Sequence, residues 1–177
     1  MTDRAPSTKM APSPVRDNVE RIRRRLKEGW VAPVARHVGF RLVEIGRGHA
    51  RTVLEAGPQH ANPMGTLHGG ILCDIADAAM GMSYASLRLP SESFTTIELK
   101  INFLRPFWSG NLSARGRIIR KGRTMGLLEC RVTDDHRRLV AYATSTCVSI
   151  PGAPGEGLTR TQGTGRNPTM RQATVKG

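Results

Sequence analysis

A glycine-rich segment followed by an acid contains the residues with the clearest chemical potential. Residues 62–70 read NPMGTLHGG, and Asp77 follows Gly70 by seven residues. Backbone N–H groups in the first turn of a helix have no partner inside the helix, and the helix dipole reinforces their positive charge. If a helix starts at Gly69 or Gly70, its amides can stabilise a carbonyl oxygen that gains negative charge. A carboxylate at position 77 can then activate water or attack the carbonyl itself.

The stretch after Gly70 has the pattern of a helix with two distinct faces. Small and polar residues recur three and four positions apart and predict one stripe: Gly70, Asp74, Asp77, Gly81 and Tyr84. Apolar residues at the same spacing predict a buried face: Ile71, Ile75, Ala78, Met82, Ala85 and Leu89. Asp77 is therefore expected two turns into the helix and away from the core. Gly81 would leave room for a substrate or a partner strand.

Each of these residues also has a simpler interpretation. Asp77 could pair with an arginine, Asn62 could only shape a turn, and His68 could only cap the loop. Their occurrence together, at these spacings, favours the chemical interpretation. Asp74 is a rival carboxylate, better explained as a helix-surface or subunit-contact residue, and Cys73 is expected to be a small core residue.

Strands are expected on both sides of this helix. Two lie between Val38 and Glu55 and are joined by a tight turn. Four follow Pro90, at 94–104, 111–120, 124–134 and 138–150, and the short turns between them predict an antiparallel meander. In the first of the four, alternate apolar residues are expected to face the core: Ile97, Leu99, Ile101 and Phe103. The expected fold class is α+β, a curved antiparallel sheet wrapped around one long central helix.

Composition divides the chain into one folded domain with additions at both ends. The expected parts are a disordered tail (1–15), a short basic helix (16–34), the folded domain (35–150) and a second disordered tail (151–177). Asp17 is placed as the cap of the short helix, and Val19, Ile22, Leu26 and Trp30 follow at helical spacing. This helix is expected to pack across the domain edge with its arginines in solvent.

The formal net charge of +13 comes from 27 basic and 14 acidic residues, and the two ends of the chain supply more than half of it. Such charge suits nucleic acid, an anionic membrane or a polyphosphate ligand, and does not choose among them. The three cysteines are too far apart for a CxxC pattern, which predicts reduced thiols. Without a signal-peptide core or an apolar membrane span, a soluble cytoplasmic protein is expected.

The strings NPMGTLHGGILCDIADAAMG, FTTIELKINFLRPF and RKGRT strongly resemble the hot-dog-fold acyl-CoA thioesterases of the phenylacetate-degradation (PaaI-like) family. The resemblance covers about residues 35–150, and its most specific element is the HGG signature with an acid seven residues later. It implies that Asp77 is the nucleophile or the general base. It also implies that Asn62 orients substrate or water, and that a backbone N–H at Gly69 or Gly70 polarises the thioester carbonyl.

The same resemblance implies further site residues and an oligomer. Thr96 stands where a hydroxyl residue, frequently serine, assists the attacking water in some members. Active sites in the family are mostly assembled across a dimer interface, so that Asp77 of one subunit would face Asn62 and His68 of another, in a homodimer or a dimer of dimers. The phosphates of CoA would contact a basic corner, with Arg105 as a weaker candidate: Arg120, Lys121, Gly122, Arg123 and Thr124.

The leading hypothesis is metal-free hydrolysis of an acyl-CoA, with no cofactor beyond this substrate. A hot-dog hydratase or dehydratase is an alternative, but those enzymes usually need a catalytic histidine facing an acid, whereas His68 precedes the helix. A non-catalytic acyl-CoA-binding regulator is a second alternative, although the N-terminal residues do not make a helix-turn-helix and nucleic acid is not an expected partner. The acyl group stays open between aryl-acetyl and aliphatic, with a pocket expected near Met64, Met80, Tyr84 and Phe94.

Overall fold

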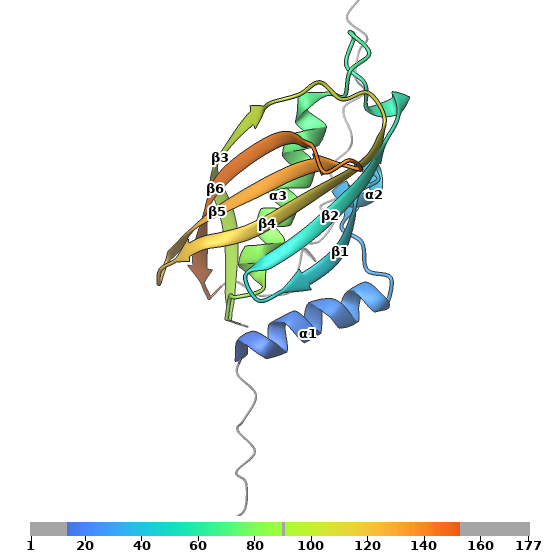
Figure 1. Cartoon of the computed structure of the whole chain (residues 1–177). Helices are drawn as coiled ribbons and strands as arrows, with labels where there is room; N and C mark the ends of the chain where they lie inside the picture. Colours follow the sequence, from blue (N-terminus) through green and yellow to red (C-terminus); the bar gives the residue numbers. More distant parts are fainter. Residues whose placement is uncertain (1–13, 90, 153–177) are drawn as a thin grey trace, which may run out of the picture.

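The computed structural model describes residues 14–89 and 91–152 (Figure 1). Its elements in chain order are α1 (Pro14–Lys27), α2 (Pro33–Val38), β1 (Arg41–Gly46), β2 (His49–Ala56), the 3₁₀ turn η1 (Pro58–His60), α3 (Gly69–Ala85), β3 (Glu92–Phe103), β4 (Gly110–Lys121), β5 (Met125–Asp134) and β6 (Leu139–Pro151). Most of the two predicted disordered tails, 1–13 and 153–177, lies outside the described residues.

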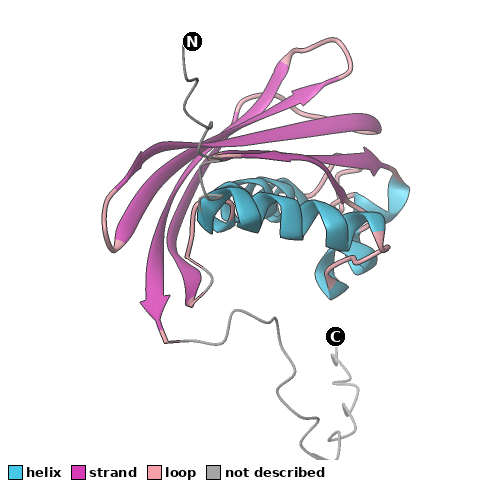
Figure 2. Cartoon of the chain, turned by 90° about the horizontal axis from the view of Figure 1, so that it is seen from below, coloured by secondary structure: helices cyan, strands magenta, loops and turns pink. Residues whose placement is uncertain are grey.

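The strands form a six-stranded sheet in the order β1-β2-β4-β5-β6-β3, and every neighbouring pair is antiparallel. Figure 2 shows the sheet curving around the helices, which lie on its concave side. The long helix α3 packs across this side and buries Ile75, Ala79 and Met80 completely. The predicted architecture, a curved antiparallel sheet around one central helix, is confirmed.

The predicted meander holds only for β4, β5 and β6, because β3 pairs with β6 at the edge of the sheet and not with β4. Tight turns join β4 to β5 and β5 to β6, whereas residues 104–109 between β3 and β4 form a longer connection. A connection of that length does not force its two strands to be neighbours. The chain therefore crosses the end of the sheet between β3 and β4.

The buried face of α3 also differs from the predicted one. The face against the sheet carries Leu72, Ile75, Ala76, Ala79, Met80, Ser83 and Tyr84. Ile71, Ala78 and Met82 are only half-buried, and Leu89 lies beyond the helix with 46% of its surface exposed. A close approach explains the choice, because a Cβ at Gly116 of β4 would lie 2.6 Å from the backbone of Ala79. The sheet packs against the helix face that has the smallest side chains at this crossing.

A bulge changes the alternation of β3. Its register with β6 shifts between Thr96 and Glu98, and Ile97 is consequently 58% exposed instead of facing the core. Phe103 is also exposed, while Leu99 and Ile101 are partly buried against the core. An extra residue in one strand shifts all following side chains by one position, and the sequence pattern does not reveal it.

The N-terminal segment forms two helices where one was predicted over 16–34. α1 starts at Pro14, before the expected cap at Asp17, and the short α2 begins with Pro33 in its first turn. α1 lies beside β1 (Figure 1). No helix in the described ranges is long and apolar enough to cross a membrane.

Candidate active site

Asp77 lies on α3 opposite Thr96 of β3. The hydroxyl of Thr96 donates a hydrogen bond to Oδ1 of Asp77 at 3.0 Å, and it also lies 3.7 Å from Sγ of Cys147. Within residues 14–89 and 91–152, Asp77 forms no ion pair. The carboxylate is therefore oriented by a neutral donor and keeps its negative charge available for chemistry.

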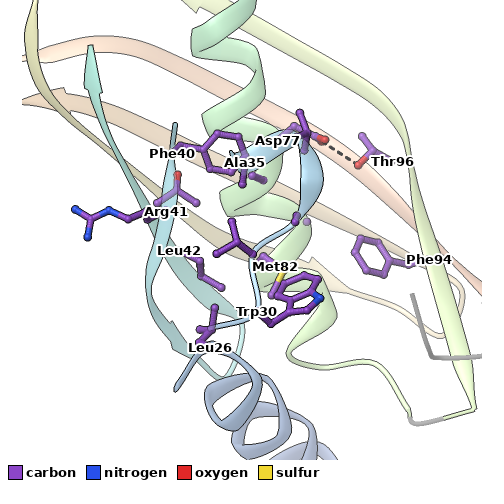
Figure 3. A pocket seen from close by; sticks show the side chains of 16 residues that line it. Leu26, Trp30, Ala35, Phe40, Arg41, Leu42, Asp77, Met82, Phe94 and Thr96 are labelled. Carbon is purple, nitrogen blue, oxygen red and sulfur yellow. Dashed lines mark hydrogen bonds between the residues drawn. The ribbon is translucent and has the colours of Figure 1, made fainter. Parts of the chain in front are cut away.

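The carboxylate borders a cavity of about 410 Å³ that is lined by residues of the three helices and of strands β1, β2 and β3 (Figure 3). The lining is mostly apolar: Leu26, Trp30, Val31, Ala32, Val34, Ala35, Phe40, Arg41, Leu42, Thr52, Asp77, Ala78, Gly81, Met82, Phe94 and Thr96. The hydroxyl of Thr52 donates to the carbonyl of Ile75 at 2.9 Å, and Figure 3 shows the guanidinium of Arg41 turned away from the other side chains. Asp77 and Thr96 are thus the polar pair that faces the cavity.

The first turn of α3 offers one unoccupied amide. His68 is the N-cap, and its Nδ1 accepts a hydrogen bond from the N–H of Gly70 at 2.9 Å. The N–H of Gly69 has no acceptor among the described residues. A Cβ at Gly69 would lie 2.8 Å from Cζ of Phe103, so glycine permits the aromatic ring to approach this turn. Of the two predicted oxyanion donors, Gly69 is the one that the geometry leaves available.

Asn62 organises the loop before this turn. Its Nδ2 donates to Oγ1 of Thr66 at 2.9 Å, and its Oδ1 accepts from the N–H of Met64 at 2.9 Å. Both contacts match the simpler interpretation of Asn62 as a turn residue. Asn62, Gly69 and Arg105 nevertheless line a common cavity of about 360 Å³.

This second cavity is separate from the one at Asp77, because the two share no lining residue. Gly69 and Asp77 are eight positions apart on one helix, which corresponds to about 12 Å along its axis. An attacking group and an oxyanion donor must both lie within roughly 3 Å of the reacting carbonyl. Asp77 and Gly69 of the same chain therefore cannot act on one carbonyl group.

The predicted basic corner is the hairpin between β4 and β5, comprising Arg120, Lys121, Gly122, Arg123 and Thr124. It lies next to the C-terminal half of α3, where the hydroxyl of Tyr84 donates to the carbonyl of Thr124 at 3.3 Å. Nζ of Lys121 lies 5.0 Å from the centre of the Tyr84 ring. Arg105, in contrast, belongs to the cavity at the start of α3. One chain therefore presents its two groups of predicted CoA-binding residues at opposite ends of α3.

Three of the four residues expected around the acyl pocket do not line the cavity at Asp77. Phe94 lines it, but Met64 is 81% exposed in the loop, and Met80 and Tyr84 are buried toward the sheet. Tyr84 contributes indirectly through a ring contact with Phe94 at 5.3 Å. Sequence reasoning missed residues in or next to strands β1 and β2, such as Phe40, Leu42 and Thr52, and it missed six residues from α1, α2 and the link between them: Leu26, Trp30, Val31, Ala32, Val34 and Ala35. The apolar stripe of α1, which needs a covering partner, is the signal that could have found Leu26 and Trp30.

Asp74 and Cys73 lie near Asp77 but line neither cavity. Burial, and secondly the negative charge of Asp77, raise the pKa of the Asp74 carboxyl. Burial and the two neighbouring carboxylates likewise raise the pKa of the Cys73 thiol. Cys73 is only half-buried, so its prediction as a core residue is wrong. A raised pKa disfavours the thiolate form of Cys73.

Comparison with known proteins shows that the chain is similar to thioesterases in sequence and in fold. A family model described as the thioesterase superfamily matches residues 64–141. The 1,4-dihydroxy-2-naphthoyl-CoA hydrolase of Listeria monocytogenes is 27% identical over 109 residues, which cover 62% of this chain and 89% of that protein. A thioesterase family protein from Silicibacter pomeroyi superposes with a TM-score of 0.65 at 26% identity, over 78% of this chain and 96% of that one.

The PaaI protein from the phenylacetic acid degradation operon of E. coli has the same fold. It superposes with a TM-score of 0.67 at 21% identity, over 78% of this chain and 94% of that chain. The hot-dog fold that the sequence resemblance implied is thereby confirmed. Its concave side carries the carboxylate, the apolar cavity and the unoccupied helix amide described above.

Proposed function

Because a model of the thioesterase superfamily matches residues 64–141, we propose that this chain hydrolyses the thioester of an acyl-coenzyme A in an Asp77-dependent, metal-free reaction at a dimer interface. The carboxylate at the end of an apolar cavity is the observation that carries the proposal. Such a cavity can hold an acyl group while the carboxylate acts on its carbonyl carbon. The hydrolase from Listeria monocytogenes, whose name specifies an acyl-CoA, supports the choice of CoA ester.

The chemistry divides between two groups. The N–H of Gly69 holds the carbonyl oxygen as it gains negative charge in the tetrahedral transition state. Asp77 either removes a proton from the attacking water or attacks the carbonyl carbon itself, in which case a mixed anhydride forms and water then hydrolyses it. In both routes CoA leaves as the thiol and the acyl group leaves as the free acid. Thr96 holds one carboxylate oxygen and thereby sets the direction of the other.

A second copy of the chain is needed to bring these groups together. In a two-fold dimer, Asp77 of one subunit can face Asn62, His68 and Gly69 of the other, which overcomes the separation of about 12 Å within one helix. Edge strand β3 has a side without a partner strand among the described residues, and it exposes Ile97 and Phe103. Unpaired edges with exposed apolar residues favour association. A homodimer, or a dimer of such dimers, is therefore the proposed active form.

The first test is a measurement of CoA release from a panel of acyl-CoA esters with a colorimetric thiol reagent. The proposal predicts release from at least one ester without added metal or cofactor. With crotonyl-CoA, loss of the enoyl chromophore without thiol release would instead favour the hydratase alternative. The geometry of His68 does not favour that alternative, because its Nδ1 accepts a hydrogen bond from the amide of Gly70 in the first turn of α3.

Thr96 supplies a prediction about orientation of the carboxylate. Replacing Thr96 by valine keeps the side-chain shape but removes the donor to Asp77, and we expect kcat to fall about tenfold or more, since hydrogen bonds to charged groups contribute roughly 1.5–3 kcal/mol. Thr96→Ser retains the hydroxyl and is expected to stay near the wild-type rate. Steady-state kinetics on both variants checks this. Equal rates for the two variants would show that the hydroxyl has no such role.

The hairpin between β4 and β5 supplies a prediction about CoA. Replacing Arg120, Lys121 and Arg123 together by alanine should raise KM about tenfold and leave kcat nearly unchanged, because exposed charge pairs contribute roughly 0.2–1 kcal/mol each. The difference from wild type should shrink at high salt, which screens attraction to phosphate. Arg131→Ala, an exposed arginine on β5, is the control. A triple variant with unchanged KM at low salt would remove the hairpin from the CoA site.

A further inference from the structure

The cavity at Asp77 is lined on one side by a segment that precedes the region matched by the family model. Six of its lining residues come from the end of α1, the start of α2 and the link between them: Leu26, Trp30, Val31, Ala32, Val34 and Ala35. We infer that residues 26–35 form the distal wall of the acyl pocket and limit the length of the acyl chains that the protein accepts. The inference rests on the proposed function, since it assigns the acyl group to this cavity.

The position of Trp30 in this wall is held by several contacts. Its backbone N–H donates to the carbonyl of Arg25 at 2.9 Å, which turns the chain back after α1. The guanidinium of Arg25 lies 5.3 Å from the centre of the Trp30 ring, in a cation–π contact. In Figure 3 the indole lies beside Met82 of α3, on the opposite side of the cavity from Asp77. Trp30 is therefore placed where the far end of an acyl group would arrive.

α1 itself is tied to the body of the domain through two backbone carbonyls. The buried side chain of Asn18 donates from Nδ2 to the carbonyl of Ala85 at the end of α3. Nη2 of Arg23 donates to the carbonyl of Ile45 on β1 at 2.9 Å. Both acceptors belong to elements that frame the cavity. Movement of α1 would break these hydrogen bonds, so the wall is a built part of the pocket and not a loose flap.

The lining also determines the chemical class of the acyl group. Between Asp77 and Trp30 the cavity presents Ala78, Met82 and Phe94. A charged acyl group would lose hydration there without gaining a partner, which is costly. The thioester end belongs next to Asp77 and Thr96, and the tail extends toward Trp30. The pocket therefore suits uncharged, apolar acyl chains.

The test compares the chain-length profile of kcat/KM for straight-chain esters from butanoyl-CoA to tetradecanoyl-CoA. Trp30→Ala should move the optimum to longer chains. Relative to the best wild-type ester, the next longer ones should gain roughly tenfold in kcat/KM, the size of effect that added space in a pocket produces. Trp30→Phe keeps an aromatic wall and should shift the profile less. Trp108→Ala is the matched control, because Trp108 is exposed and does not line the cavity.

A binding measurement gives a second readout that does not depend on turnover. The chain has two tryptophans, so Trp108→Phe leaves Trp30 as the only one. A non-hydrolysable thioether analogue of the preferred acyl-CoA should change the fluorescence of Trp30, whereas CoA without an acyl group should not. An analogue that is too short to reach the wall should produce a smaller change.

The outcomes separate the two proposals. Suppose that the wild type releases CoA, that Trp30→Ala keeps the wild-type chain-length profile, and that the analogue leaves Trp30 fluorescence unchanged. The assignment of residues 26–35 as the distal wall of the acyl pocket is then overturned, and the proposed function stands. If the wild type releases CoA from no ester of the full panel, aryl-acetyl esters included, the proposed function fails and this inference fails with it. Release from aryl-acetyl esters alone would overturn this inference and leave the proposed function standing. A shifted profile together with a fluorescence change on acyl binding supports both.

Discussion

Replacing Asp77 by asparagine is expected to lower kcat for thioester hydrolysis by about two to four orders of magnitude, the usual contribution of a positioned acid or base. Asparagine has nearly the same shape and can still accept the hydrogen bond from Thr96. It lacks the charge that is needed to take a proton or to attack a carbonyl. Because Asp77 forms no ion pair among the described residues, circular dichroism and thermal unfolding should show an intact fold.

Asp74→Asn is the matched control, three positions earlier on the same helix. It lines neither cavity and should retain the wild-type rate. Because burial and the charge of Asp77 raise the pKa of Asp74 in the folded protein, ionisation of Asp74 opposes folding. Asp74→Asn should therefore slightly increase the free energy of unfolding at neutral pH, and this gain should vanish as the pH falls below the unfolded pKa of about 3.9. Near-normal turnover in Asp77→Asn, or an equal loss in both variants, would contradict the assignment.

Removing the amide hydrogen of Gly69 is expected to have the second largest effect. Gly69 is the first residue of α3, a position at which proline is well tolerated in helices. His68 has φ −64° and ψ 132°, a conformation that suits a residue before proline. Gly69→Pro should therefore preserve the helix start while it deletes the donor. Loss of one oxyanion donor typically lowers kcat by about 10²–10³-fold, and we expect a reduction of that size.

Gly69→Ala separates the donor from the steric effect. Both substitutions place a Cβ against the ring of Phe103, which can move because it is exposed, but alanine keeps the N–H. Alanine should consequently cost much less activity than proline. The test is to compare the kcat values of the two variants by steady-state kinetics, with thermal unfolding to confirm that both are folded. Equal kcat values for alanine and proline would exclude the Gly69 amide as the oxyanion donor.

The features that were predicted correctly from the sequence are those set by patterns of neighbouring residues. The six strands, the start of the long helix at Gly69 and the spacing from HGG to Asp77 depend on neighbouring residues, and the structure contains all of them. The roles of Asn62, His68 and Thr96 stay predictions. The hydrogen bond from Gly70 to His68 removes one of the two candidate amides, which a sequence pattern could not show.

The features that the sequence did not predict depend on contacts between segments that are distant in the chain. Apolar residues lie on more than one side of α3, and the close approach of Gly116 to Ala79, made by a strand far along the chain, determines which side the sheet covers. The pairing of β3 with β6 likewise depends on register across the sheet. Trp30 enters the cavity only because α1 docks against the ends of β1 and α3. Spacing along the chain does not contain these relations.

The most direct test of the composite site is a mixed dimer of Asp77→Asn and Gly69→Pro subunits, made by co-expression and purified through two different affinity tags. One of its two sites would combine the intact Asp77 of one subunit with the intact Gly69 of the other. We therefore predict about half of the wild-type kcat per dimer, although each parent dimer is nearly inactive. Activity no higher than that of the parents would contradict the account, because it would mean that each site is built within a single chain.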